Sequence, residues 1–169
     1  GVSTFAITGL TYAIVVSIHD DGIQLVDVSD PSSPVAVGAA TDGQGGFTEL
    51  DGAHAVSTFV VGGFTYAIVA SHSDDGIQLV DVSDPSSPVA VSAATDGQGG
   101  FTELDGARGV STFVVGGSTY AIVSSEYDDG IQLVSLSQCP ASVIWGTSPR
   151  RTCADTDADG TPDAFACPA

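Results

Sequence analysis

A repeat of 54 residues dominates this chain of 169 residues and constrains its fold more than any other feature. The motif VSTF recurs at this constant spacing, beginning at Val2, Val56 and Val110. The first two copies are near-duplicates that differ at only ten positions. Such self-similarity is typical of chains that stack one supersecondary unit several times. We therefore predict three units and a tail, with boundaries at residues 1–54, 55–108, 109–146 and 147–169.

Each copy contains four short runs rich in Val, Ile, Thr, Tyr and Phe, which favour β-strands. In the middle copy these runs occupy residues 56–61, 65–71, 77–82 and 89–95. Gly-Gly and Asp-Gly pairs between the first three runs predict tight hairpins, and the DPSSP segment predicts a turn before the fourth. The second and third runs are apolar on both faces, so both sides of the sheet should be covered. The sequence thus predicts an all-β fold of three tandem four-stranded antiparallel blades of the propeller type.

The run YAIVASHSDDGIQLVDVSDPSSPVAV at residues 66–91, with its counterpart at 12–37, resembles the LVIVD-type repeats of secreted and surface proteins. The resemblance covers roughly residues 1–138 and implies a β-propeller. Each copy is longer than a usual blade of about 40 to 50 residues. The excess falls in segments such as 96–107, where we expect an ornamented loop between blades.

Three blades are too few to close a ring, because propellers typically have about four to eight. Unless the natural chain continues beyond these residues, the first and last blades each present an apolar sheet face to water. Another copy can cover these faces head to tail, giving either a closed ring or a filament. The chain itself is therefore the expected partner.

The charge balance excludes several classes of partner. Three arginines stand against 21 acidic residues, for a net charge of −18, and there is no lysine. A nucleic-acid-binding surface needs clustered basic side chains, and anionic membranes are disfavoured for the same reason. No apolar run approaches the roughly 20 residues of a spanning helix, so we expect no membrane insertion. Such an acidic surface suits salty or extracellular surroundings, where counterions screen self-repulsion.

All three cysteines lie in the tail region, at Cys139, Cys153 and Cys167. Their spacing lacks a CxxC pair, which argues against zinc and favours disulfides in an oxidising compartment. Cys153 with Cys167 is the preferred pair, and Cys139 with Cys153 is the alternative. The third cysteine is then either free or bonded to another chain.

Between those cysteines lies an acidic segment with the spacing of a calcium loop. Its candidate ligands are Asp155, Asp157, Asp159, Thr161 and Asp163, with Gly160 at the sharp turn. Oxygen ligands at alternate positions suit a hard Ca²⁺ ion, and the segment is similar to thrombospondin type 3 repeats. Position 12 is Ala166 rather than a bidentate Glu, so either the affinity is weak or another segment completes the shell. A solvated acidic linker is the alternative interpretation.

Other motifs give no catalytic constellation. His19, His54 and His72 occupy different positions of the repeat, so each is interpreted as a surface or loop residue. The DGQGG segment lacks the lysine and helix of a phosphate loop and is interpreted as a flexible turn. The doublets at 20–21, 74–75 and 128–129 could each bind an ion, but Asp-Gly turns explain them equally.

We therefore expect a non-enzymatic, extracellular structural protein that assembles through its blade faces into a surface layer, appendage or filament. An adhesin or carbohydrate-binding propeller is the alternative, with ligands contacted by Phe47, Glu49 and Asp51 of the long loop. A calcium-dependent hydrolase of the lactonase type is a third possibility, for which no converging His is evident.

Overall fold

The computed structural model describes residues 1–136, which form three antiparallel sheets and contain no helix. Sheet 1 contains β1 (Val2–Ile7), β2 (Leu10–Ser17), β3 (Gly22–Asp27) and β4 (Val35–Thr41). Sheet 2 contains β5 (Ala53–Val61), β6 (Phe64–Ser71), β7 (Gly76–Asp81) and β8 (Val89–Thr95). Sheet 3 contains β9 (Ala107–Val115), β10 (Ser118–Ser125) and β11 (Ile131–Ser135). The predicted all-β class and the antiparallel, propeller-like blades are confirmed.

Each sheet is a meander in which every strand pairs with the next strand in the sequence. The first hairpin of sheet 2 turns at Gly62 and Gly63, whose φ angles are 59° and 83°. Positive φ at both positions is the geometry of a type I′ turn, whose twist matches that of the flanking strands. Thr8 and Gly9 make the same turn in sheet 1 with φ angles of 51° and 85°. The turn signals of the sequence therefore fix the strand register.

The second hairpin of each sheet turns at an Asp-Gly pair, as the sequence predicts. Asp21, Asp75 and Asp129 adopt left-handed φ angles of 49°, 54° and 52°. Aspartate tolerates this region better than most residues that carry a side chain. In the DPSSP turn of sheet 2, Asp84 Oδ1 accepts hydrogen bonds from the backbone N–H and hydroxyl of Ser86. These local bonds stabilise the turn that leads into β8.

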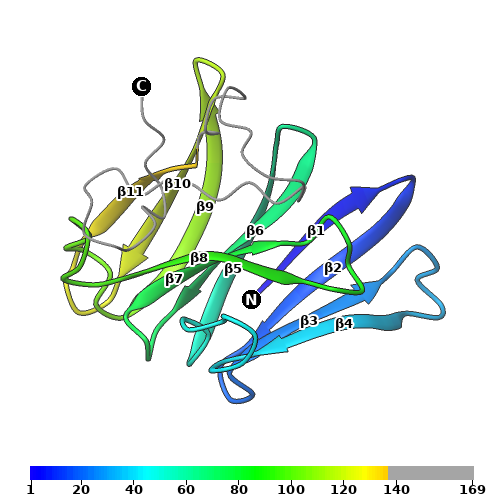
Figure 1. The fold of residues 1–169 in the computed structure, drawn as a ribbon, viewed down its shortest axis with the longest axis horizontal. Coiled ribbons are helices and arrows are strands. Elements are labelled where there is room, and N and C mark those ends of the chain that lie inside the picture. The colour runs from blue at the N-terminus through cyan, green and yellow to red at the C-terminus, as the bar shows by residue number, and fades with distance from the viewer. Residues whose placement is uncertain (137–169) are drawn as a thin grey trace, which may run out of the picture.

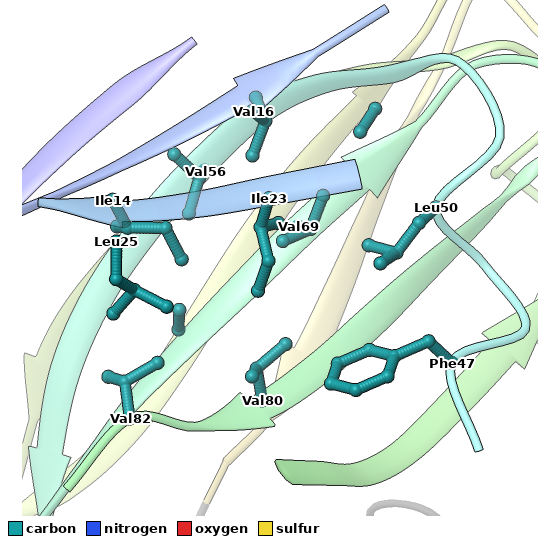
Figure 2. Close-up of a cluster of buried hydrophobic side chains, with 12 residues drawn as sticks. Ile14, Val16, Ile23, Leu25, Phe47, Leu50, Val56, Val69, Val80 and Val82 are labelled. Atoms are coloured by element: carbon teal, nitrogen blue, oxygen red, sulfur yellow. The ribbon is translucent and has the colours of Figure 1, made fainter. Parts of the chain in front are cut away.

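The three sheets lie side by side in chain order, with sheet 2 between the other two (Figure 1). Two apolar clusters fill the spaces between them, one at each junction. Figure 2 shows the cluster between sheets 1 and 2, in which Ile14, Ile23 and Leu25 face Val69, Val80 and Val82. Because sheet 2 contributes to both clusters, it is covered on both faces, as its apolar pattern predicts.

The long segment between β4 and β5 is a structural part of the first junction rather than a free loop. Phe47 is 5% exposed and Leu50 fully buried, and both point into the cluster of Figure 2. Glu49, which lies between them, is 7% exposed. The interpretation of Phe47 and Glu49 as ligand-contacting residues is therefore wrong, because these side chains complete the core between the sheets.

Candidate functional site

The junctions between sheets define two kinds of surface on each blade. We call the face that packs on the following sheet the forward face and the opposite one the rear face. In sheet 2 the forward face carries Ile68, Ala70, Ile77 and Leu79, and the rear face carries Ala67, Val69, Val80 and Val82. Their repeat equivalents form the same faces in sheets 1 and 3, because strand residues alternate between the two sides.

The forward face is buried in sheets 1 and 2 and open in sheet 3. Ile77 is 0% and Leu79 is 9% exposed, whereas their equivalents Ile131 and Leu133 are each 58% exposed. These fractions refer to the described part of the chain, residues 1–136. Sheet 3 therefore presents to water an apolar surface that covers a neighbour at both internal junctions.

The rear face shows the converse pattern. Val69 and Val123 are fully buried in sheets 2 and 3, whereas their equivalent Val15 in sheet 1 is 39% exposed. Val2, on β1, is 63% exposed, although its equivalent Val56 is only 7% exposed. Sheet 1 thus presents the surface that is complementary to the open face of sheet 3, and these two end faces are the candidate site.

Hydroxyl pairs join the first strands of neighbouring sheets. Ser3 Oγ lies 2.8 Å from Thr58 Oγ1, and Ser57 Oγ lies 2.9 Å from Thr112 Oγ1. Thr58 also donates to the carbonyl of Thr4, and Thr112 donates in the same way to the carbonyl of Thr58, each at 3.3 Å. Each threonine has a single hydroxyl hydrogen, so the serine donates in each pair.

The aspartate doublets hold the long loops against the sheets on either side. Asp74 Oδ2 accepts from the N–H of Asp51 in the preceding loop at 2.7 Å. Asp75 Oδ1 accepts from the N–H of Gly106 in the following loop at 2.8 Å. The same bonds run from Asp128 to Asp105 and from Asp21 to Gly52. The doublets therefore link consecutive blades, a role that the sequence did not reveal because it depends on contacts between copies.

Glu49 is the most unusual ionisable group among the described residues. Its Oε1 accepts from the hydroxyl of Thr95 at 2.6 Å, whereas its buried Oε2 has no hydrogen-bond partner. The pKa of Glu49 is raised to about 7, chiefly by burial; the hydrogen bond from Thr95 lowers it, and the nearby carboxylates of Asp74, Asp42 and Asp75 contribute to the rise. Glu49 is therefore partly protonated at neutral pH, which reduces the cost of burying a carboxyl group.

The same acidic cluster perturbs Asp74. Burial raises the pKa of Asp74 to about 6, and repulsion from Asp42, Asp51 and Asp21 acts in the same direction against the N–H of Asp51. The structure nevertheless places no three His, Cys, Asp or Glu side chains of residues 1–136 so that they could share a metal ion. In the structure Asp42 and Asp74 instead accept hydrogen bonds from the backbone N–H groups of Leu50 and Asp51.

The second junction carries a charged contact that the first lacks. Glu126 pairs with the guanidinium of Arg108, and its Oε2 lies 3.3 Å from His72 Nε2. The ring of His72 also meets Tyr127 edge to face, with 5.2 Å between centroids. His72 thus lies between two blades, which its single occurrence in the repeat did not indicate.

The remaining predicted site residues fall outside the described part of the chain. These are the calcium-loop residues Asp155, Asp157, Asp159, Thr161 and Asp163, and the cysteines Cys139, Cys153 and Cys167. The predicted calcium site and disulfide therefore stay predictions. Within residues 1–136 there is no helix with the length and hydropathy needed to cross a bilayer.

Comparison with known families agrees with the blade geometry. The family model of the LVIVD repeat matches residues 11–42 and 52–96, which correspond to the body of sheets 1 and 2. The chain therefore contains LVIVD repeats. The first match begins within β2 and the second just before β5; each ends one residue past the fourth strand of its sheet, so both include the acidic doublet. No curated protein matches the chain.

Proposed function

We propose that this chain is a non-enzymatic extracellular structural protein that assembles into a surface layer, an appendage or a filament. The forward face of sheet 3 would pack on the rear face of sheet 1 in the next copy. One observation carries this proposal: Leu133 is 58% exposed, whereas Leu25 and Leu79 at the same repeat position are 0% and 9% exposed.

The two exposed apolar side chains on the forward face of sheet 3, Ile131 and Leu133, cannot drive assembly alone. Burying a fully exposed Leu or Ile stabilises by about 1.5 to 3 kcal/mol, so Ile131 and Leu133 together contribute at most a few kcal/mol. Association costs an estimated 4 to 15 kcal/mol in lost freedom of motion. The interface must therefore involve the whole sheet face, as the internal junctions do, in which Ile14, Ile23 and Leu25 pack across a full sheet.

Charge sets the conditions under which such an assembly would form. Each copy carries a net charge of −18, so neighbouring copies repel one another at low ionic strength. Salt screens this repulsion, with a Debye length of about 10 Å at 0.1 M and about 3 Å at 1 M. We expect assembly to strengthen with salt, which is consistent with the proposed extracellular location.

Calcium and a disulfide are part of the proposal. Asp155, Asp157, Asp159, Thr161 and Asp163 would bind Ca²⁺, and a disulfide between Cys153 and Cys167 would stabilise the loop. The support is the ligand spacing of the sequence and the preference of Ca²⁺ for oxygen ligands. Chelation should then increase proteolysis of residues 147–169, and unchanged proteolysis would favour the solvated-linker interpretation.

Light scattering coupled to size exclusion tests the assembly. The measured mass should be a multiple of 16.9 kDa, and Leu133→Glu should shift it toward that of the monomer. Val114→Glu is the matched control, because Val114 lies on the same sheet and is 66% exposed. Assembly that responds equally to both substitutions, or a stable monomer of the unmodified chain, would contradict the proposal.

A further inference from the structure

Serine and threonine hydroxyls pair at both internal junctions, but the equivalent hydroxyls at the two ends of the described chain have no such partner. Ser111 occupies the position of Ser3 and Ser57 in the repeat, and it is exposed. Thr4 occupies the position of Thr58 and Thr112, and it is also exposed. Neither hydroxyl has a hydrogen-bond partner among residues 1–136, although all their equivalents at the junctions are paired.

The hydrogen-bonding groups at the two ends are complementary. At a junction, the earlier strand offers a serine hydroxyl and a threonine carbonyl, and the later strand offers a threonine hydroxyl. On β9, Ser111 and the carbonyl of Thr112 form the first set. On β1, the hydroxyl of Thr4 forms the second set. Both lie beside the exposed apolar residues of their sheets, which continue the surfaces of the internal junctions.

On the basis of the proposed self-assembly, we infer that a second copy docks with its β1 alongside β9 in the register of the internal junctions. Ser111 donates its hydroxyl hydrogen to Thr4 Oγ1 of the second copy, and that threonine donates to the carbonyl of Thr112. The internal pairs fix this register, because they join residues 55 positions apart at both junctions. The occupant of the end face is therefore another copy of this chain in one defined alignment.

Few other alignments of β1 along β9 are compatible with the apolar contact and the hydrogen bonds. A shift of one residue turns the wrong side chains toward the neighbour, whereas a shift of two preserves the apolar side and misplaces the hydroxyls. Only the aligned arrangement satisfies both the apolar contact and the two hydrogen bonds. The hydroxyl pair thus acts as a register determinant, while the apolar face supplies the buried surface.

Cysteine cross-linking in the full chain tests the register. The double variant Ser111→Cys with Thr4→Cys should form a disulfide between copies under mild oxidation, because side chains in this relation approach bonding distance. Mixing isotopically labelled and unlabelled chains distinguishes bonds between copies from bonds within one copy by mass spectrometry. Peptide mapping assigns the bond despite the three native cysteines.

Two matched variants control the experiment. Ser57→Cys with Thr112→Cys should link within one chain, because these hydroxyls lie 2.9 Å apart. Ser111→Cys with Ala6→Cys represents the register shifted by two residues. This variant keeps the Thr4 hydroxyl, whose bond of about 1 kcal/mol to the carbonyl of Thr112 favours the aligned register, so the shifted pair should link roughly fivefold less.

The outcomes separate this inference from the proposed function. Assembly with selective linking of the aligned pair supports both. Assembly with equal linking of the aligned and shifted pairs overturns the register and leaves the proposed assembly standing. A stable monomer of the unmodified chain overturns both.

Discussion

The two internal junctions have almost the same sequence but different surroundings. At the first junction, between sheets 1 and 2, Phe47 and Glu49 are 5% and 7% exposed. At the second, between sheets 2 and 3, their equivalents Phe101 and Glu103 are only half-buried. In the described chain β8 lies against the first loop, where its Thr95 donates a hydrogen bond to Glu49. Sheet 3 has three described strands, so no described equivalent of β8 lies against the second loop. Identical residues therefore contribute differently to the free energy of unfolding, depending on how far the neighbouring strands bury them.

Truncation of the loop phenylalanine should give the largest difference between the junctions. Phe47→Ala removes a buried ring from the first cluster and should lower the free energy of unfolding by about 3 to 5 kcal/mol. Phe101→Ala should cost clearly less, because its ring already meets solvent. Chemical denaturation of the two variants measures both values. Equal losses would show that the two loops are equally buried in solution.

A methyl group at the glycine after each doublet should give the next largest difference. A Cβ at Gly76 would meet the carboxyl of Glu49 and would lie 2.7 Å from the carbonyl oxygen of Ala94. Because a backbone atom cannot move aside, Gly76→Ala should cost about 1 to 3 kcal/mol.

Gly130→Ala is the matched control for that substitution. Its Cβ would meet only the half-buried side chain of Glu103 at close range, and that side chain can rotate away. We expect a loss below about 1 kcal/mol in thermal or chemical unfolding. A larger loss than at Gly76 would contradict the proposed tight fit of Glu49.

The pH dependence of stability should reveal the protonation of Glu49. Its pKa is raised from 4.5 to about 7 on folding, so between these values the folded state binds more protons than the unfolded state. Stability therefore falls as the pH rises from about 4.5 to about 7, and it stays reduced above that range. The raised pKa of Asp74, about 6, acts in the same direction.

Glu49→Gln should flatten this fall and stabilise the protein at pH 8 by on the order of 1 kcal/mol, after allowance for solvent screening. The same change at the half-buried position, Glu103→Gln, is the control and should affect stability less. Denaturation series from pH 4 to pH 8 provide the measurement. An undiminished fall in the Glu49 variant would assign the pH dependence to other groups.

The charged contact at the second junction should have the smallest effect. Glu126 and Arg108 have side chains that are 41% and 51% exposed, and exposed ion pairs contribute about 0 to 1 kcal/mol. Glu126→Gln should therefore destabilise by at most that amount, and 1 M salt should abolish the difference. The first junction has His72 and His54 at these positions, so it offers no equivalent pair. A larger loss that persists in salt would indicate packing rather than charge.

Much of the fold was predictable from local sequence signals. The Gly62-Gly63 and Asp75-Gly76 turns fix where strands end, and the predicted run at 89–95 matches β8. The start of β5 at Ala53, three residues before the predicted 56, was not predictable, because Ala53 enters the strand through contacts with the loop and the first cluster. Local propensity carries no information about such contacts.

The sequence by itself determined the repeat, the meander of each blade and the apolar character of both faces, because these depend on residue spacing and turn chemistry. Only the tertiary structure decided that Phe47 and Glu49 are buried, that the aspartate doublets join neighbouring blades and that the hydroxyls of Ser111 and Thr4 lack partners among residues 1–136. The physical reason is that near-identical copies carry the same residues, and only their neighbours in space make one copy different from the next.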